Sequence, residues 1–197
     1  METTWTFDDD PPGGLPAAWR VEQTNPRGDA AEWAVLEDAE AASGRRMLAL
    51  TDARGARGST YNIAWTDAVQ FRDGHVEVKV RAGTGREDQG GGPIWRVRDR
   101  DNYYIARWNP LEDNVRLYFV RDGSRRELAS ADVRASRGEW HSIAIEQRGE
   151  RITGYFDGQR IWDVTDGTLT SAGGVGVWTK ADAATGFDDL ALTQGSP

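Results

Sequence analysis

Apolar and polar residues alternate along most of this chain, and turn-forming residues break the alternation at intervals of about 8–12 residues. In HVEVKVRA, Val76, Val78 and Val80 share one face, whereas His75 and Glu77 lie on the other. Comparable runs follow, many of them closed by Asp-Gly, Gly-Gly or Asn-containing turns: IWRVRD, NYYIARWN, VRLYFV, HSIAIEQ, RITGYF, RIWDV, VGVWT and FDDLAL. This pattern predicts about ten to twelve short strands, negligible helix and an all-β sandwich or barrel.

Two segments need separate interpretation. AEWAVLEDAEAAS contains good helix formers throughout, but we interpret Glu32 to Glu37 as a strand and Asp38 to Ser43 as an irregular turn. A predicted strand near Trp5–Phe7 resembles the closing FDDLAL run, so we expect the two termini to lie side by side.

Composition narrows the functional classes. The 197 residues show no linker, internal repeat or composition shift, so we expect one domain over 1–197. We also expect the protein to be a monomer. A formal net charge of −8 without basic clusters argues against nucleic acid and anionic membranes as partners. No apolar run approaches about 18 residues, so we expect no membrane insertion. The absence of cysteine excludes disulfides, thiol catalysis and thiolate metal sites, and two histidines argue against a His-rich zinc or iron site.

Three stretches carry a family resemblance. GGGPIWRVRDRDNYYIARWNPLEDNVRLYFVRDG, EWHSIAIEQRGERITGYFDGQRIWDV and GGVGVWTKADAATGFDDLAL together resemble the concanavalin A-like jelly-roll superfamily. Within it, they look most like laminin-G-like and 3-keto-disaccharide-hydrolase-type domains of bacterial extracytoplasmic proteins. The resemblance implies a two-sheet antiparallel jelly-roll β-sandwich whose concave face meets carbohydrate. It also implies an extracytoplasmic location, although METTWTFDDDPPGG has no features of a signal peptide, so the sequence leaves the location open.

Glycoside cleavage requires a suitably placed pair of carboxylates. The best-known enzymes of this superfamily carry Glu-x-Asp-x-Glu on one strand, which brings two carboxyl groups within about 5–5.5 Å. No strand of this sequence presents that spacing. Glu112, Asp182 and Glu87 are the remaining candidate acids, and none has a motif behind it. Gly-x-Ser-x-Gly is also absent, and His75 and His141 each lie in an alternating strand without a placed partner.

A cluster of aromatic and polar residues predicts a binding site instead. Aromatic rings stack on sugars, and Arg, Asn and Glu form directional hydrogen bonds to hydroxyl groups. The candidates are Gln89, Trp95, Arg96, Arg107, Asn109, Glu112, Asn114, Arg116, Trp178 and Lys180. The first of these candidates, Gln89, lies in GTGREDQGGG. We interpret this segment as a flexible loop between strands, whose glycines let a ligand approach the backbone.

Strand periodicity places several of these candidates together. Alternation puts Arg107 and Asn109 on one face, and the PLEDN turn returns Glu112 and Asn114 to the end of that face. The family resemblance adds Trp178 as a stacking wall and Lys180 as a charged rim.

We therefore predict a carbohydrate-binding, lectin-like domain with its saccharide site on the concave sheet. The alternatives are a glycoside-cleaving enzyme of the 3-keto-disaccharide hydrolase type and a protein-interaction domain of the laminin-G kind. A structural salt-bridge network, with Glu112 or Asp113 pairing the arginines, would account for the same residues without a ligand.

Acidic residues gather near both termini. TFDDD and FDDL bring Asp8, Asp9, Asp10, Asp188 and Asp189 toward one place if the terminal strands pair. Several jelly-roll carbohydrate modules hold Ca²⁺ between an acidic residue of the first strand and an Asp of the last, positions that Asp8 and Asp188 match best. We therefore expect a structural Ca²⁺ there, with a solvated acidic turn as the alternative.

Overall fold

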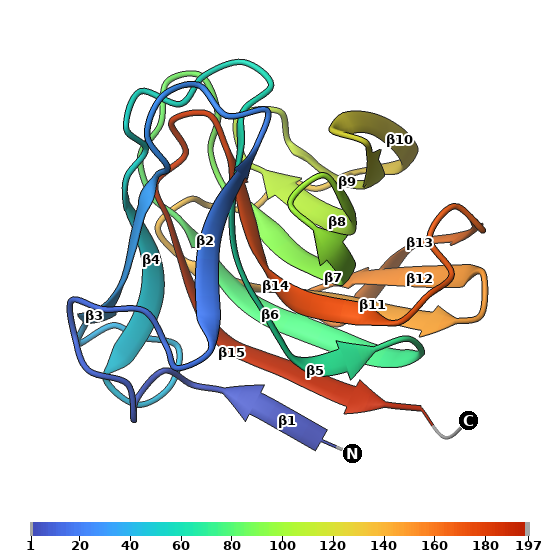
Figure 1. Cartoon of the computed structure of the whole chain (residues 1–197), viewed down its shortest axis with the longest axis horizontal. Coiled ribbons are helices and arrows are strands. Elements are labelled where there is room, and N and C mark those ends of the chain that lie inside the picture. Colours follow the sequence, from blue (N-terminus) through green and yellow to red (C-terminus); the bar gives the residue numbers. More distant parts are fainter. Residues whose placement is uncertain (1, 196–197) are drawn as a thin grey trace.

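The computed structural model describes residues 2–195, and in that range the chain forms fifteen strands and no helix. The strands build two antiparallel sheets that pack face to face as a sandwich (Figure 1). The same range contains no helix long and apolar enough to cross a membrane. The predicted all-β sandwich is therefore confirmed.

One sheet has eight strands. They are β1 (Glu2–Trp5), β3 (Glu32–Glu37), β4 (Arg46–Asp52), β6 (Gly74–Ala82), β11 (Trp140–Arg148), β12 (Arg151–Phe156), β13 (Gln159–Thr165) and β15 (Thr185–Gln194). Their order is β13-β12-β11-β6-β15-β4-β3, and β1 pairs with β15 beside this path.

The other sheet has seven strands. They are β2 (Trp19–Thr24), β5 (Tyr61–Phe71), β7 (Gly92–Asp99), β8 (Asn102–Asn109), β9 (Asn114–Arg121), β10 (Ser124–Asp132) and β14 (Gly173–Lys180). Their order is β10-β9-β8-β7-β14-β5-β2.

The main core lies between the sheets. Val76, Val78 and Val80 of β6 are fully buried there, as alternation requires, against Trp95 and Trp108 of the opposite sheet. Burial of each large apolar side chain contributes about 1.5–3 kcal/mol, so this contact dominates the stability of the sandwich.

A second apolar cluster covers the outer face of the seven-stranded sheet. We call it the outer cluster, and all of its members come from that sheet: Tyr61, Ile63, Trp65, Ile94, Val97, Tyr103, Ile105, Tyr118, Val120 and Trp178. Each is at most 5% exposed. The central strands of this sheet are therefore buried on both faces. This is unusual for the side of an antiparallel sheet that does not pack on the other sheet.

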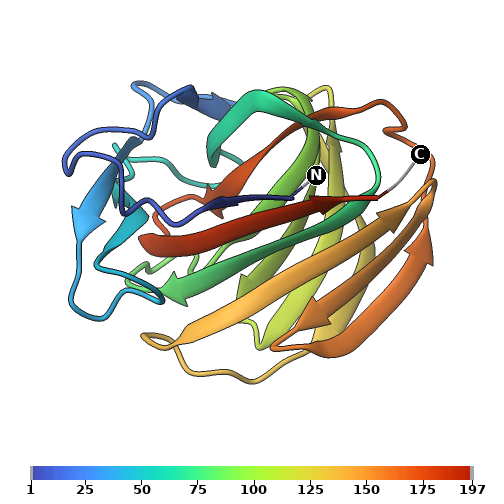
Figure 2. The same ribbon diagram turned by 90° about the horizontal axis from the view of Figure 1, so that it is seen from below.

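The terminal strands meet as expected. Glu2 to Trp5 pair with Thr193 to Leu190 in antiparallel register, and Figure 2 shows β1 (dark blue) alongside β15 (red). The strand interpretation of Glu32–Glu37 and the irregular interpretation of 38–43 are also confirmed.

The predicted number of strands is wrong, because the sequence pattern missed β2, β4, β5 and β10. β4 is a continuous apolar run, since Met47 to Leu50 are all buried. β10 is largely polar and lies at the edge of its sheet. Neither arrangement produces a two-residue period.

Candidate functional site

On the outer face of β8, the apolar residues of the outer cluster are followed by polar residues near the end of the strand. Tyr103 and Ile105 belong to the outer cluster, and Arg107 and Asn109 follow at the next alternate positions. The guanidinium carbon of Arg107 lies 5.9 Å from the ring centroid of Tyr118, which is part of the same cluster. Arg107 therefore lies on the outer face, as the alternation predicts.

The β8–β9 turn brings a carboxylate back to Arg107. Asn109 Oδ1 accepts a hydrogen bond from the amide of Leu111 at 2.9 Å, and Asp113 adopts a positive φ of 51°. The reversed chain places Glu112 Oε2 3.0 Å and Asn114 Oδ1 3.1 Å from Arg107 Nη2, which donates to both. This short turn therefore builds half of the site locally.

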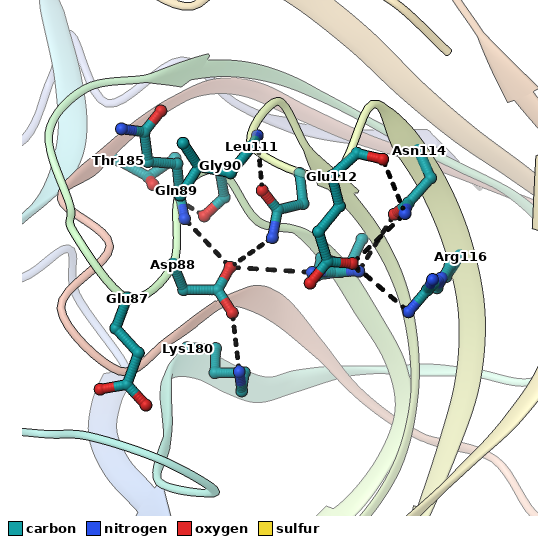
Figure 3. A network of polar contacts seen from close by, with 12 residues as sticks. Glu87, Asp88, Gln89, Gly90, Leu111, Glu112, Asn114, Arg116, Lys180 and Thr185 are labelled. Atoms are coloured by element: carbon teal, nitrogen blue, oxygen red, sulfur yellow. Dashed lines mark hydrogen bonds and ion pairs between the residues drawn. The ribbon is translucent and has the colours of Figure 1, made fainter. Parts of the chain in front are cut away.

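Asp88 provides the other half from the loop before β7. Its Oδ1 accepts from Asn109 Nδ2 at 2.8 Å, and its Oδ2 accepts from Lys180 Nζ at 2.9 Å (Figure 3). Arg107 Nη1 lies 3.7 Å from the same carboxylate. Side chains from β8, β9, β14 and the β8–β9 turn therefore surround the buried charges of Arg107 and of Asp88 in its loop.

We call this set the Arg107 cluster. Its members are Asp88, Arg107, Asn109, Glu112, Asn114, Arg116 and Lys180. The side chains of Arg107 and Asp88 are each 2% exposed, whereas those of Glu112 and Arg116 are 43% and 33% exposed. The cluster is therefore closed at its base and open at its rim. Burying two charges costs several kcal/mol per ion, and the surrounding partners offset that cost.

One donor at the base remains unused. Arg107 Nε is buried and has no hydrogen-bond partner among the described residues. An unpaired buried donor is destabilising by about 1–3 kcal/mol.

Glu112 is held in its ionised form. Burial raises its pKa, but the hydrogen bond and charge of Arg107, with contributions from Asn114 and Arg116, outweigh that effect and keep the pKa below its usual range. A carboxyl group with a lowered pKa is a poor proton donor at neutral pH.

Asp182 and Glu87 have other partners. Asp182 accepts backbone N–H bonds from Arg86, Glu87 and Asp88 at 2.7–3.0 Å. Burial raises the pKa of Asp182, and these amides more than compensate and lower it. Glu87 accepts from the Gly58 amide at 2.6 Å, and in Figure 3 its carboxylate points away from the Arg107 cluster. Asp182 therefore serves to hold the loop that carries Asp88.

Trp178 lies beneath the site but offers no free ring. It is fully buried, and its Nε1 donates to Tyr103 Oη at 3.1 Å. The guanidinium carbon of Arg125 lies 5.9 Å from the Trp178 ring centroid. The prediction of an open stacking wall is corrected here, because Trp178 supports the site from below.

Three other predicted residues are directed elsewhere. Trp95 is fully buried between the sheets and donates to Gln147 Oε1 at 2.9 Å. Arg96 donates to the backbone carbonyls of three loops, at Arg72, Gly149 and Leu169. Gln89 donates to the Gly85 carbonyl at 3.0 Å within its own loop. The structure therefore does not bring these three side chains together with Arg107.

The glycines of the 83–92 segment allow neighbouring strands to pack closely against its backbone. A Cβ on Gly91 would lie 2.1 Å from the Trp178 carbonyl oxygen, and one on Gly92 would lie 1.9 Å from that of Ala106. Backbone packing occupies the space that the sequence interpretation reserved for a ligand.

The two histidines have different surroundings. His141 Nδ1 lies 2.8 Å from Asp157 Oδ2, and the ring stacks on Phe156 at 5.3 Å between centroids. His75 Nε2 lies 3.4 Å from Glu77 Oε2 on the outer face of the eight-stranded sheet. Neither histidine is part of the Arg107 cluster.

Sequence reasoning missed Asp88, Tyr118 and Arg125. Asp88 was embedded in a loop assigned as flexible, and Tyr118 was counted only as strand. Arg125 lies opposite Val120 in the β9–β10 hairpin. The Asp122-Gly123 turn was recognisable and would have placed Arg125 on the face of Tyr118 had β10 been assigned.

The acidic residues of the two termini also come together. Asp188 is fully buried and accepts from the backbone amides of Ser43 and Asp189, at 3.0 and 2.7 Å. Asp8 accepts from the amides of Arg45 and Arg46 at 2.8 and 3.1 Å. Burial raises the pKa of Asp188 to about 6, and the charges of Asp189 and Asp8 add to that effect.

This arrangement fits a cation in one respect. Within residues 2–195 the Asp188 carboxylate forms no ion pair, and the charges of Asp189 and Asp8 repel it. The nearby cation is Arg46, whose Nη1 donates to the backbone carbonyls of Asp8 and Asp10 at 2.6 and 2.9 Å. The same range holds no group of three or more His, Cys, Asp or Glu side chains suited to a metal. Any bound ion would therefore depend on backbone carbonyls for its remaining ligands, as calcium sites commonly do.

Comparison with solved structures identifies the architecture. Carbohydrate-binding module CBM66 of Bacillus subtilis superposes with a TM-score of 0.66 at 17% identity, covering 89% of this chain and 96% of the module. A β-glucanase of Bacillus licheniformis gives 0.64 at 10% identity, covering 98% of each chain. The chain has the concanavalin A-like jelly-roll fold.

A third solved structure shares this fold. The exoplasmic/lumenal domain of VIP36, in a Ca²⁺- and mannose-bound form, gives a TM-score of 0.61 at 16% identity, covering 91% of this chain and 84% of that one. No protein-family model matches the sequence, and no curated protein matches it significantly. The jelly-roll architecture is therefore established from structure, while the finer likeness to laminin-G-like domains stays a prediction.

Proposed function

We propose that this protein binds a saccharide on the outer face of the seven-stranded sheet, at the rim of the Arg107 cluster. The observation that carries the proposal is the convergence of two almost fully buried charges, Arg107 and Asp88, beneath three partly exposed ones. Directional donors and acceptors set over aromatic rings are what sugar hydroxyl groups require.

The exposed rim presents both donors and acceptors. Glu112 supplies a carboxylate, and Arg116 and Lys180 supply cationic N–H groups. Each is anchored by a contact of 3.3 Å or less to another member of the cluster. The rim is therefore preorganised, and binding would order few additional side chains.

Proteins of the same fold support a carbohydrate ligand. They include a carbohydrate-binding module, the mannose-bound exoplasmic/lumenal domain of VIP36 and a β-glucanase. Fold likeness alone does not assign an activity. The main support for saccharide binding is therefore the Arg107 cluster itself.

Binding is favoured over cleavage by the state of the candidate acids. The pKa values of Glu112 and Asp182 are both lowered, and Asp182 is engaged by three backbone amides. A glycosidase needs one carboxyl group with a raised pKa beside the scissile bond. Glycoside cleavage of the 3-keto-disaccharide type remains the alternative, and the same experiment tests it.

The test compares glycan binding by the intact protein and by Glu112→Gln. Calorimetric titration with a panel of glycosides and 3-keto-glycosides is run in parallel with product analysis. We expect saturable binding without product release, and a loss of about tenfold in affinity for Glu112→Gln, since one charge-assisted hydrogen bond is weakened. Glu146→Gln, on the outer face of the other sheet, should bind normally. Product release that Glu112→Gln abolishes would establish the enzyme, and a folded protein that binds no glycan would refute the proposal.

We further propose that Asp8 and Asp188 hold a structural Ca²⁺. Support comes from the buried Asp188 carboxylate and the repulsion between it and the partly exposed Asp8, near the paired termini. Added Ca²⁺ should raise the melting temperature of chelator-treated protein, and Asp188→Asn should remove that response. An unchanged melting temperature would leave the cluster as an acidic turn.

A further inference from the structure

A guanidinium group caps the aromatic rings beside the Arg107 cluster. The guanidinium carbon of Arg125 lies 4.2 Å from the ring centroid of Tyr118 and 5.1 Å from that of Tyr61. Cation–π contact of this kind is stabilising and fixes the plane of the guanidinium over the rings. The Nε and Nη2 groups of Arg125 form no hydrogen bond among the described residues and are not fully buried, whereas Nη1 is buried.

Arg125 has no anionic partner. Among residues 2–195 Arg125 forms no ion pair with a carboxylate, and Glu127, two residues further along β10, pairs with Arg116 instead. Most arginines of the neighbouring strands are paired, as Arg116 is with Glu112 and Glu127. A half-buried guanidinium without a counter-charge is costly unless a ligand supplies one.

Two further arginines stand close by. Arg107 and Arg116 lie directly opposite each other in the β8–β9 register. Like charges at such positions destabilise a sheet, and Glu112 bridges both at 3.0 and 3.3 Å. All three arginines contact Tyr118, since Arg116 Nη1 lies 3.5 Å from its hydroxyl group.

The local charge is opposite to that of the whole chain. The charged side chains around Tyr118 include one more cation than anions: Asp88, Arg107, Glu112, Arg116, Arg125, Glu127 and Lys180. The chain carries a net charge of −8. Concentrating arginines on one face of an acidic protein favours an anionic ligand at that face.

We infer that the saccharide bound here is acidic, carrying a carboxylate or a sulfate group that pairs with Arg125. The inference rests on the proposed saccharide site and specifies its ligand class. Arg125 is the specificity-determining residue, because its planar guanidinium offers the unpaired donors that match a carboxylate or sulfate. Glu112 and Arg116, which are exposed at the rim, would then hold the neutral hydroxyl groups of the same sugar.

Matched ligand pairs test this inference. Oligogalacturonate is compared with its methyl ester, which removes the charge and keeps the ring, and a sulfated galactan oligosaccharide is compared with its unsulfated form. We expect the charged member of one pair to bind at least about tenfold more tightly, with affinity falling as salt rises. Which pair responds distinguishes the carboxylate from the sulfate source.

Variants of adjacent arginines provide the control. Arg125→Gln should abolish the preference for the charged ligand, and Arg125→Lys should retain part of it. Arg126→Gln removes the same charge from the next residue, which is exposed and pairs opposite Phe119 on the other face of the hairpin, and it should leave the preference intact. Circular dichroism confirms that each variant is folded.

The outcomes separate the two proposals. Equal binding of charged and neutral members, or a preference that survives Arg125→Gln, would overturn the acidic-ligand inference and leave saccharide binding standing. Failure of every saccharide, charged or neutral, to bind folded protein would overturn saccharide binding itself.

Discussion

Replacing Asp88 by Asn tests whether its charge stabilises the base of the site. The carboxylate accepts hydrogen bonds from Lys180 at 2.9 Å and Asn109 at 2.8 Å, and it faces Arg107 at 3.7 Å. An Asn side chain keeps the volume and one acceptor, but it removes the negative charge. Arg107 then retains Glu112 as its single carboxylate partner, and Lys180 loses its ion pair.

The expected cost follows from burial. Removing one partner of a buried ion pair costs about 3–5 kcal/mol. The Lys180 side chain is 19% exposed and recovers some hydration, so we expect the lower end, about 3 kcal/mol. For a domain of about 150–250 residues, that loss corresponds to a decrease of about 6–12 °C in melting temperature.

Urea denaturation at pH 7 measures the free energy of unfolding directly. The matched control is Asp113→Asn, because Asp113 is 55% exposed and pairs with an 89%-exposed Arg134 at 3.7 Å. That variant should change the unfolding free energy by less than about 0.5 kcal/mol. A loss below about 1 kcal/mol for Asp88→Asn would refute the view that Asp88 compensates buried positive charge.

Two further predictions concern packing and pH. Gly92→Ala should unfold the protein or destabilise it by several kcal/mol, because the added Cβ would lie 1.9 Å from the Ala106 carbonyl oxygen. The control variant Gly14→Ala should be tolerated, because its Cβ has only a 3.9 Å contact. Equal thermal stability of the two variants would contradict this packing. Because the folded-state pKa of Asp188 is raised to about 6, its contribution to stability is complete below the unfolded pKa of about 3.9 and is lost as pH rises through about 6. In chelator, Asp188→Asn should therefore gain stability relative to wild type between pH 4 and 7, and a pH-independent difference would argue against the raised pKa.

Local periodicity explains what the sequence revealed about the site. Alternation in NYYIARWN requires Arg107 and Asn109 to share a face, and a short turn requires Glu112 and Asn114 to return nearby. These contacts lie within seven residues of one another. They could be predicted because no distant segment decides them.

For a strand that is buried on both faces, the sequence pattern does not reveal which side chains point into the core and which point to the outer face. Ile94 belongs to the outer cluster and Trp95 to the main core, and a positive φ of 49° at Arg96 interrupts the strand just after them. Both faces are apolar, so a hydrophobic pattern cannot assign Trp95 to the interior or the outer face. The same ambiguity concealed the burial of Trp178.

Distant contacts explain the remaining errors. Asp88 reaches Lys180 across 92 positions of sequence, and its loop is held by Asp182 across 94. Such pairings depend on how β7 and β14 are brought together, which no local pattern records. Arg125 was missed because β10 is polar and lies at an edge.

Backbone amide chemical shifts, measured by NMR during titration with a saccharide that the protein binds, test the location of the site most directly. We predict that the largest changes fall in the 85–90 loop, the 107–116 turn and the start of β10, with the outer face of β11 and β12 unaffected. Changes concentrated on β11 and β12 would contradict saccharide binding at the Arg107 cluster.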